Sequence, residues 1–506
     1  MDKIGFTWLC DHFAIQAAPL THESYIGGRR RIDADAHQHC VVEYFAANYR
    51  PEPAPMAHLE FALKYDDLHL DLLKKIFEHI PPSEIVAYIE ERPSSKYSRQ
   101  IGFLYEFLTN KILPLSKAVS GNYADLLDGK RYVVATPTRN ARWLINDNLL
   151  GTPQFCPVIR KTAFIRKQVD TDYTSRLKSF QGDIPPDLFR RAIDYLYFKE
   201  SKSSYDIERE TATPDREAKF VEALKRAGSV AASVTLTEQY LAELQSVIVD
   251  ARFAHDSFRT WQNYVGQNML GRAQRIHYVC PPGMFVHSLM EGLAQAAIKA
   301  GGINPVIRAA IISFGFVFIH PFEDGNGRLH RFLIHDTLAH DKFVPEGMIL
   351  PVSAYMLRNT GEYDAVLERY SRPLSRLVDY TLNHDDEMTV NSPGMIEGYY
   401  RYPDMTPQVE YLFYAVEQTI STELIAEVLF LQHYDEAREK IQAIVDLPDR
   451  QLDLMIKLLH QNNGTLSKAK RSRFPSLHDD EILAMESAYR SLLSTAEPVM
   501  RVESKH

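Results

Sequence analysis

The densest group of chemically useful side chains in this chain lies between residues 320 and 331. His320 can take up or release a proton near neutral pH, because an unperturbed imidazole titrates there. Asp324 can hold Mg²⁺, a hard cation that proteins bind through carboxylates together with phosphate oxygens. A proton acceptor and a metal-binding carboxylate in one short loop indicate a site for phosphate chemistry.

The same loop and its exit contain groups suited to binding an anion. Asn326 stands between Gly325 and Gly327, and glycine permits the backbone angles with which successive N–H groups converge on an anion. Arg328 and Arg331 are three residues apart, so on a helix they share one face and can both donate to phosphate oxygens. We therefore predict a phosphate-binding nest supported by two cations.

The flanking sequence predicts that this loop joins two helices. Asn304-Pro305 is typical of an N-cap and a first helical position, and residues 306–319 are apolar almost all round, as in a buried helix. Pro321 disfavours helical geometry at the residue before it, so the helix should end near His320. A helical period resumes over 328–340, where the helix N-terminus favours a phosphate. The alternative, a plain turn with surface arginines, leaves the histidine and the aspartate to coincidence.

This loop matches, at every specified position, the signature His-x-Phe-x-(Asp/Glu)-Gly-Asn-Gly-Arg-x-x-Arg of the Fic family. The chain thus resembles a family whose characterised members mostly transfer AMP from ATP to a Ser, Thr or Tyr hydroxyl of a target protein. The resemblance implies that His320 deprotonates the attacking hydroxyl and that Asp324 holds Mg²⁺ between the α- and β-phosphates. It also implies that backbone amides of residues 325–327 cradle the phosphates, with Arg328 at the β-phosphate and Arg331 at the γ-phosphate. Other members use other donors, so the residues alone leave the nucleotide open.

A second resemblance to the family lies upstream of the loop. Many Fic proteins carry an inhibitory helix with the pattern (Ser/Thr)-x-x-x-Glu-(Gly/Asn), whose glutamate pairs with the second arginine of the motif. Here Ser204 and Glu208 fit, while Arg209 stands where Gly or Asn is expected. The resemblance implies an inhibitory helix near 202–212 in which Glu208 competes with ATP for Arg331, and it allows the reverse, AMP-removing reaction. On its residues alone this stretch is also a common exposed polar helix face.

Two further segments are candidates for substrate contacts. Residues 266–282 alternate like a hairpin, and Fic proteins use a hairpin flap here to hold the target protein as an added strand. An ordinary surface hairpin predicts the same pattern. Asn359 and Tyr363 fall where the family closes its nucleotide pocket, so the resemblance makes them candidate adenine or ribose contacts. Both residues also fit an ordinary polar surface.

Composition places the chain among soluble globular proteins, with 506 residues, 45% hydrophobic, 24% charged and a net charge of −9. That charge makes DNA an unexpected partner. We expect no membrane span, because no apolar run reaches the necessary length. The cysteines are far apart and suggest neither a zinc site nor a disulfide framework, so a cytoplasmic location is expected. The sequence leaves open whether the chain is a monomer or a homodimer.

The predicted fold class is mainly α: a Fic-type helical core with a small β-hairpin flap, between two mostly helical regions. We expect an N-terminal region over 1–190 with short strands after Tyr132, a catalytic domain over 191–385, and a helical, winged-helix-like module over 395–506. A linker-like stretch from Asn383 to Gly394 separates the last two. The basic cluster at 468–473 leaves an alternative function open: a nucleotide-binding regulatory or scaffold protein whose C-terminal module binds DNA or a partner.

Overall fold

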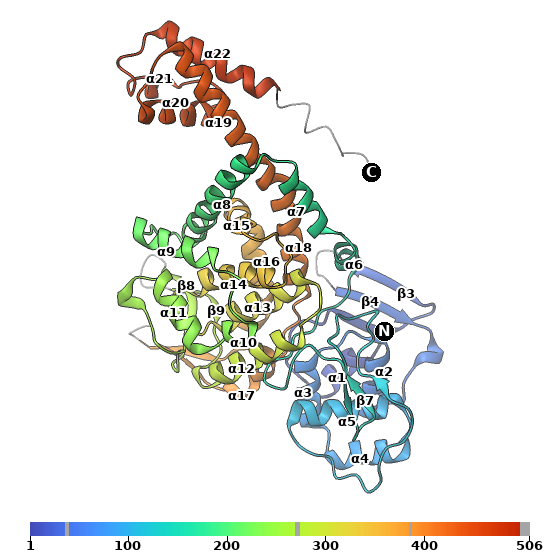
Figure 1. Cartoon of the computed structure of the whole chain (residues 1–506). Helices are drawn as coiled ribbons and strands as arrows, with labels where there is room; N and C mark the ends of the chain where they lie inside the picture. Colours follow the sequence, from blue (N-terminus) through green and yellow to red (C-terminus); the bar gives the residue numbers. More distant parts are fainter. Residues whose placement is uncertain (36–39, 269–273, 384–386, 496–506) are drawn as a thin grey trace.

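The computed structural model of the chain describes residues 1–35, 40–268, 274–383 and 387–495. The fold is mainly α with a few short strands, which confirms the predicted class (Figure 1). Buried apolar clusters form the cores of an N-terminal region, a central helical body and a C-terminal module. Within these residue ranges, no helix combines the length and apolar character that a membrane span requires.

The N-terminal region combines two small sheets with a group of helices. The first sheet has the strand order β1-β2-β4-β3, in which β2 runs parallel to β4, and the second has the order β5-β7-β6. The sequence predicts a mainly helical region with short strands after Tyr132, where β6 and β7 lie, but it does not predict the first sheet. The elements are β1 (Asp2–Ile4), α1 (Gly5–His12), β2 (His22–Ile26), β3 (Arg31–Asp35), β4 (Cys40–Phe45), η1 (Ala47–Tyr49), α2 (Pro55–Tyr65), α3 (Leu70–His79), α4 (Pro82–Glu91), α5 (Lys96–Thr109), β5 (Ala124–Asp125), β6 (Thr138–Asn140) and β7 (Ile145–Asp147).

The central body surrounds one helix, α13 (Pro305–Ile319), which is buried along almost its whole length. Its other elements are α6 (Ala163–Val169), α7 (Tyr173–Gly182), α8 (Pro186–Ile207), α9 (Pro214–Lys225), α10 (Ala232–Thr235), α11 (Glu238–Ile248), η2 (Ala251–Phe253), β8 (Tyr264–Asn268), β9 (Gln274–Val279), α12 (Gly283–Lys299), α14 (Asn326–His340), α15 (Val352–Arg358), α16 (Thr360–Ser375), β10 (Tyr380–Leu382), β11 (Met388–Val390), α17 (Pro393–Arg401) and α18 (Thr406–Gln418). α13 packs against α12, α14 and α18. An apolar helix enclosed in this way gives the motif loop at its end a rigid support.

α8 is longer than the sequence predicts. The Pro185-Pro186 pair starts it, as expected, but it continues to Ile207, through residue 190 where the sequence suggested a boundary between regions. The inhibitory helix expected near 202–212 is therefore the last part of α8, and residues 208–212 lie beyond the helix. α8 contacts α14 and α15 of the central body.

The C-terminal module is reached through a continuous helical path from α18. A π-helical turn (Thr419–Glu423) follows α18, and α19 (Leu424–Ile444) then leads away from the central body (Figure 1). α20 (Asp449–Gln461), α21 (Lys468–Arg471) and α22 (Asp479–Thr495) pack with the end of α19 around a core of their own. The stretch expected as a linker contains β11, which pairs antiparallel with β10, and residues 384–386 within it lie outside the described ranges.

Candidate active site

Local capping fixes where the motif loop begins and ends. At the start of α13, Asn304 accepts a hydrogen bond on Oδ1 from the Val306 backbone N–H at 3.0 Å, the N-cap that the sequence predicts. α13 ends at His320, whose backbone is left-handed with φ 53°. Gly325, with φ 85°, caps the N-terminus of α14, a conformation that glycine adopts without steric cost. The free N–H groups of the first turn of α14 therefore face the loop.

Asn326 fastens this loop through its side chain. Its Oδ1 accepts from the Phe322 backbone N–H at 3.0 Å, and its Nδ2 donates to the Phe322 carbonyl at 2.9 Å. The Phe322 ring is fully buried and packs edge-to-face on Phe258. The sequence predicts only the backbone role of Asn326, whereas the structure shows that its amide also closes the loop.

His320 is placed to act as a base at neutral pH. Its Nδ1 lies 3.2 Å from the Val317 carbonyl oxygen. A carbonyl only accepts, so Nδ1 carries the proton in that contact and Nε2 of the neutral ring keeps a free lone pair. Burial and, second, the guanidinium of Arg259 lower the pKa of His320 to about 4. The imidazole is therefore neutral at pH 7, with Nε2 unprotonated.

Arg259 holds the His320 end of α13, a role that no local sequence pattern around it indicates. Its Nε donates to the His320 carbonyl at 2.7 Å, and its Nη2 donates to the Ile319 carbonyl at 3.2 Å and to the Pro281 carbonyl at 2.8 Å. The side chain is fully buried, and its Nη1 donates to the Trp261 carbonyl at 2.7 Å. One cation thus satisfies carbonyls at the C-terminus of α13, where the helix dipole favours positive charge.

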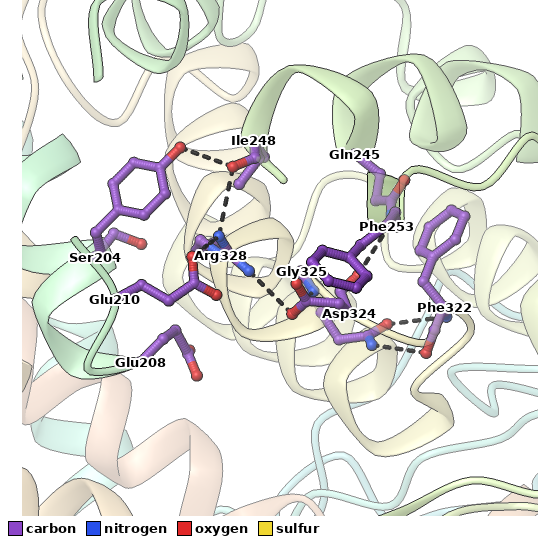
Figure 2. A network of polar contacts seen from close by, with 12 residues as sticks. Ser204, Glu208, Glu210, Gln245, Ile248, Phe253, Phe322, Asp324, Gly325 and Arg328 are labelled. Atoms are coloured by element: carbon purple, nitrogen blue, oxygen red, sulfur yellow. Dashed lines mark hydrogen bonds and ion pairs between the residues drawn. The ribbon is translucent and has the colours of Figure 1, made fainter. Parts of the chain in front are cut away.

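Arg328 lies between two carboxylates (Figure 2). Its Nη2 donates to Asp324 Oδ1 at 2.9 Å, and its Nη1 donates to Glu210 Oε2 at 2.8 Å. Asp324 Oδ1 also accepts from the Gly325 backbone N–H at 2.6 Å. The Arg328 side chain is 1% exposed and the Asp324 side chain 42% exposed, so the carboxylate remains open to solvent while the cation is enclosed. Sequence reasoning did not single out Glu210.

Arg331, one helical turn further along α14, contacts the end of α8. Its Nε donates to Ser204 Oγ at 2.8 Å, and its Nη2 donates to the Ser204 carbonyl and to Glu208 Oε1, each at 2.8 Å. The Arg331 side chain is almost fully buried. The structure therefore brings together Ser204, Glu208 and Arg331, the three residues that the family resemblance connects.

The end of α8 has the geometry of a Schellman motif. Arg209 is left-handed, with φ 57°, and its N–H donates to the Asp206 carbonyl at 3.0 Å. The Glu210 N–H donates to the Tyr205 carbonyl at 3.1 Å. These are the two hydrogen bonds that close a helix when the residue after the C-cap is left-handed, a position that favours Gly or Asn. The arginine at this position therefore has an unfavourable backbone conformation, and the turn presents Glu208 and Glu210 to α14.

The contacts between α8 and α14 repeat every four residues along both helices. The three pairs are Glu200 with His335, Ser204 with Arg331, and Glu208 with Gly327. In the first pair, Glu200 Oε1 lies 2.7 Å from His335 Nε2 in a buried setting. In the last, a Cβ added to Gly327 would lie 2.1 Å from Glu208 Oε1, so the carboxylate sits directly on the glycine backbone. We call this series the α8–α14 ladder.

Comparison with known proteins identifies the domain that contains this site. Residues 235–338 match the Fic/DOC family. The chain contains a Fic/DOC domain. The matched range includes the motif loop and α14 up to Leu338, while Ser204 and Glu208 precede it.

Individual relatives share only parts of the chain. It is similar to the protein adenylyltransferase fic-1 of Caenorhabditis elegans, with 46% identity over 50 residues, and this match spans 10% of the chain and 9% of the relative. Among solved structures, a Fic family protein from Desulfovibrio desulfuricans G20 shares 19% identity at a TM-score of 0.38, covering 60% of this chain and 87% of that one. A Fic domain containing signaling protein from Bacteroides thetaiotaomicron has 19% identity at a TM-score of 0.35, with coverage of 50% and 95%. A Fic-1 structure from C. elegans has 15% identity at a TM-score of 0.32, with coverage of 75% and 99%.

The two candidate nucleotide contacts after the Fic/DOC domain lie in different settings. Tyr363 is buried beside Arg331 and Glu208, and burial raises the pKa of its hydroxyl to about 12. Its ring lies 6.1 Å from that of His330, nearly parallel to it. Asn359 joins α15 to α16, and its Nδ2 donates to the Tyr355 carbonyl at 3.0 Å. The structure thus brings Tyr363 to the arginine and uses the Asn359 amide locally.

The expected flap is present as a two-stranded hairpin of β8 and β9. Tyr264 pairs with Val279, and the register shifts at Val265/Gly266. β9 packs against α16. Residues 269–273 of the expected flap lie outside the described ranges. The described part of the hairpin therefore borders the same helix that carries Tyr363.

Proposed function

We propose that this chain is a protein adenylyltransferase, which transfers AMP from ATP to a hydroxyl side chain of a target protein. The observation that carries the proposal is a neutral histidine at the end of one helix beside two buried arginines at the start of the next. His320 supplies the base, and Arg328 and Arg331 supply the cations. The activity in the name of the C. elegans relative supports the same chemistry.

In the proposed reaction, the target hydroxyl oxygen attacks the α-phosphorus of ATP. A new P–O bond forms, and the bond from the α-phosphorus to the oxygen that bridges to the β-phosphate breaks, so pyrophosphate leaves. His320 Nε2 takes the hydroxyl proton, within the reach expected of a general base. Arg328, Arg331 and the N–H groups at the start of α14 stabilise the charge on the leaving pyrophosphate.

Asp324 is the residue that would hold Mg²⁺. The donor set fits this ion: a carboxylate that remains partly exposed, next to the position proposed for the phosphates. Mg²⁺ commonly takes one or two protein carboxylates and completes its shell with phosphate oxygens and water. Glu323, the neighbouring carboxylate, lies 3.0 Å from His255 and is directed to a different partner. When bound, the cation would neutralise phosphate charge and align the leaving group.

We further propose that the end of α8 inhibits the enzyme. Glu208 accepts a hydrogen bond from Arg331 and lies against the Gly327 backbone. A γ-phosphate bound at this position would need the same guanidinium group and the space beside the same backbone. Two anions at one guanidinium repel each other, so ATP with its γ-phosphate in place requires Glu208 to leave. We call residues 204–210 the inhibitory segment. A displaced Glu208 that orients water would support removal of AMP from the target.

The target protein would bind along the flap. An exposed hairpin can accept an extended peptide as an added strand, with main-chain hydrogen bonds that are independent of sequence. β9 borders the helix that carries Tyr363, so a peptide on the flap would lie near the proposed nucleotide position. Its hydroxyl side chain would then face His320.

Radiolabelled ATP tests the proposal directly. The full-length chain is incubated with α-³²P-ATP, Mg²⁺ and a cell lysate, and label on protein is measured after electrophoresis. Wild-type protein should label weakly and Glu208→Gly strongly, while the double variant Glu208→Gly/His320→Ala should not label. His287→Ala, which removes a half-exposed histidine of α12, serves as the matched control in the same background and should label like Glu208→Gly.

Absence of label in both the wild type and Glu208→Gly would contradict the adenylyltransferase proposal. Parallel incubations with labelled UTP, GTP and CTP establish whether another nucleotide is the donor. Nucleotide binding without any transfer would instead favour the regulatory or scaffold function. Mass spectrometry of the labelled band identifies the target and the modified side chain.

A further inference from the structure

Glu210, two residues after the inhibitory glutamate, contacts the first arginine of the motif. Its Oε2 lies 2.8 Å from Arg328 Nη1, a distance typical of a charge-assisted hydrogen bond. Figure 2 shows Glu210 approaching Arg328 from the side of α8 and Asp324 from the motif loop. The inhibitory segment therefore places one carboxylate on each of the two arginines.

We infer that Glu210 is a second inhibitory residue, which blocks the phosphate position at Arg328 as Glu208 blocks the one at Arg331. The inference rests on the proposed function in taking both arginines as phosphate ligands. Because Arg328 is enclosed and already paired with Asp324, a second carboxylate there leaves it without charge for an incoming phosphate. Removal of Glu208 alone would then leave half of the phosphate site occupied.

The Schellman turn at the end of α8 makes the two carboxylates act together. Arg209 is the left-handed residue between them, and the Glu210 N–H is fixed to the Tyr205 carbonyl. If the turn opens, both carboxylates lose the backbone geometry that directs them to α14. The turn is therefore the element whose opening would free both arginines.

A second arginine lies close enough to Glu210 to serve as an alternative partner. Arg216 on α9 lies 3.4 Å from the same Glu210 oxygen. Arg216 and Arg328 both donate to the Ile248 carbonyl, at 2.8 and 3.4 Å, and their guanidinium groups lie 5.4 and 5.3 Å from the centre of the Tyr205 ring. The two arginines are thus held side by side with the carboxylate between them.

This arrangement defines how phosphate binding would proceed at Arg328. An incoming phosphate would take the hydrogen bonds of Arg328, and Glu210 would move its contact entirely to Arg216. The Glu210 side chain is 33% exposed, so it can rotate without leaving a buried charge unpaired. Arg216 would therefore be a positioning residue that favours the open state, and it would act only through Glu210.

Binding of inorganic tripolyphosphate with Mg²⁺, measured by calorimetry on the full chain, tests the inference. This probe carries phosphates but no base or transferable AMP, so its affinity reports the phosphate site without any contribution from a nucleoside. In a Glu208→Gly background, Glu210→Gln should lower Kd by about tenfold, the size of effect expected for one removed charge–charge contact. Glu222→Gln, the same change at an exposed position of α9, should leave Kd within about twofold. An unchanged or raised Kd for Glu210→Gln overturns the inference.

Arg216→Met separates positioning from a structural role. In Glu208→Gly it should raise Kd by about fivefold, because Glu210 then has only Arg328 as a partner; in Glu208→Gly/Glu210→Gln it should change nothing. An equal effect in both backgrounds contradicts the role assigned to Arg216. ATP labelling of the same variants is measured in parallel. If Kd depends on Glu210 but none of the variants is labelled, the result supports the block by Glu210 at Arg328 and rejects the adenylyltransferase proposal.

Discussion

Arg259 Nε donates to the backbone carbonyl of His320 at 2.7 Å, although the two residues belong to separate segments of the chain. This bond, together with the one to the Ile319 carbonyl, fixes the end of α13 and with it the base. The position of the proposed catalytic histidine thus depends on a residue that precedes the flap.

Arg259→Lys should therefore impair both stability and catalysis. An ammonium group cannot reach all the carbonyls that the guanidinium satisfies, and buried carbonyls left unpaired cost about 1–3 kcal/mol each. We expect the free energy of unfolding, measured with urea, to fall by about 3 kcal/mol and labelling in a Glu208→Gly background to fall at least about tenfold. Arg252→Lys, at an exposed arginine, is the control. Equal stability of the two variants would contradict this role for Arg259.

Arg209→Gly should strengthen inhibition. The residue has φ 57° at the left-handed position of the Schellman motif, which costs a side chain about 1–2 kcal/mol relative to glycine. We expect a higher melting temperature and weaker ATP labelling than in the wild type, because the closed turn becomes more stable. Arg209→Ala, which removes the same charge but keeps the strain, should not raise the melting temperature. If both variants are equally stabilised, the effect belongs to the arginine side chain and not to the backbone.

Gly327→Ala should depend on Glu208. The added Cβ would lie 2.1 Å from Glu208 Oε1 and 3.4 Å from Arg331 Nη1. In the wild type the added methyl group would displace the Glu208 carboxylate from Arg331, and we expect the free energy of unfolding to fall by about 1–3 kcal/mol. In Glu208→Gly the nearest remaining atom is at an ordinary contact distance, so the same change should cost much less. Equal losses in the two backgrounds, measured by urea unfolding, would show that the carboxylate does not lie on Gly327.

The pH dependence should reflect the lowered pKa of His320. Its folded-state pKa of about 4 is below the ordinary value of 6.5, so between these pH values the unfolded chain binds a proton that the folded chain does not. The contribution of neutral His320 to the free energy of unfolding is therefore fully present above pH 6.5 and is lost as the pH falls toward 4. Buried His330, with a pKa lowered to about 3, acts in the same direction.

Labelling by Glu208→Gly should consequently stay constant as the pH falls from 7.5 to about 5.5, because the base remains unprotonated. The measurement is the initial rate of labelling in buffers of constant ionic strength, with circular dichroism at each pH to confirm that the chain is folded. A midpoint near pH 6.5 in folded protein would mean that His320 is not held in the buried state described here.

Local rules were sufficient to predict the motif loop. The cap at Asn304, the helix end before Pro321 and the glycine at the start of α14 each follow from one residue and its immediate neighbours. The family resemblance added Ser204 and Glu208, which the structure places at Arg331. The roles implied for these residues in catalysis and inhibition remain proposals.

Contacts that depend on tertiary packing could not be predicted from the sequence. Arg259 and Glu210 are single charged residues in unremarkable surroundings, and only the fold shows that they meet His320 and Arg328. The first sheet was missed for a similar reason, because β2 pairs in parallel with β4 on one side and antiparallel with β1, across α1, on the other. Short strands of this kind are stabilised by pairing partners and not by their own residue pattern.

The α8–α14 ladder makes the inhibitory segment sensitive to helical phase. Each step along α8 turns a side chain by about 100°, and four steps make slightly more than one full turn, so Glu200, Ser204 and Glu208 return to nearly the same face. The buried contact of Glu200 with His335 sets the starting angle. A single residue inserted between Glu200 and Ser204 would rotate everything after it by more than a quarter turn and carry the carboxylates away from α14. Changes in sequence can therefore be tolerated along the outer side of this stretch, but changes in its length cannot.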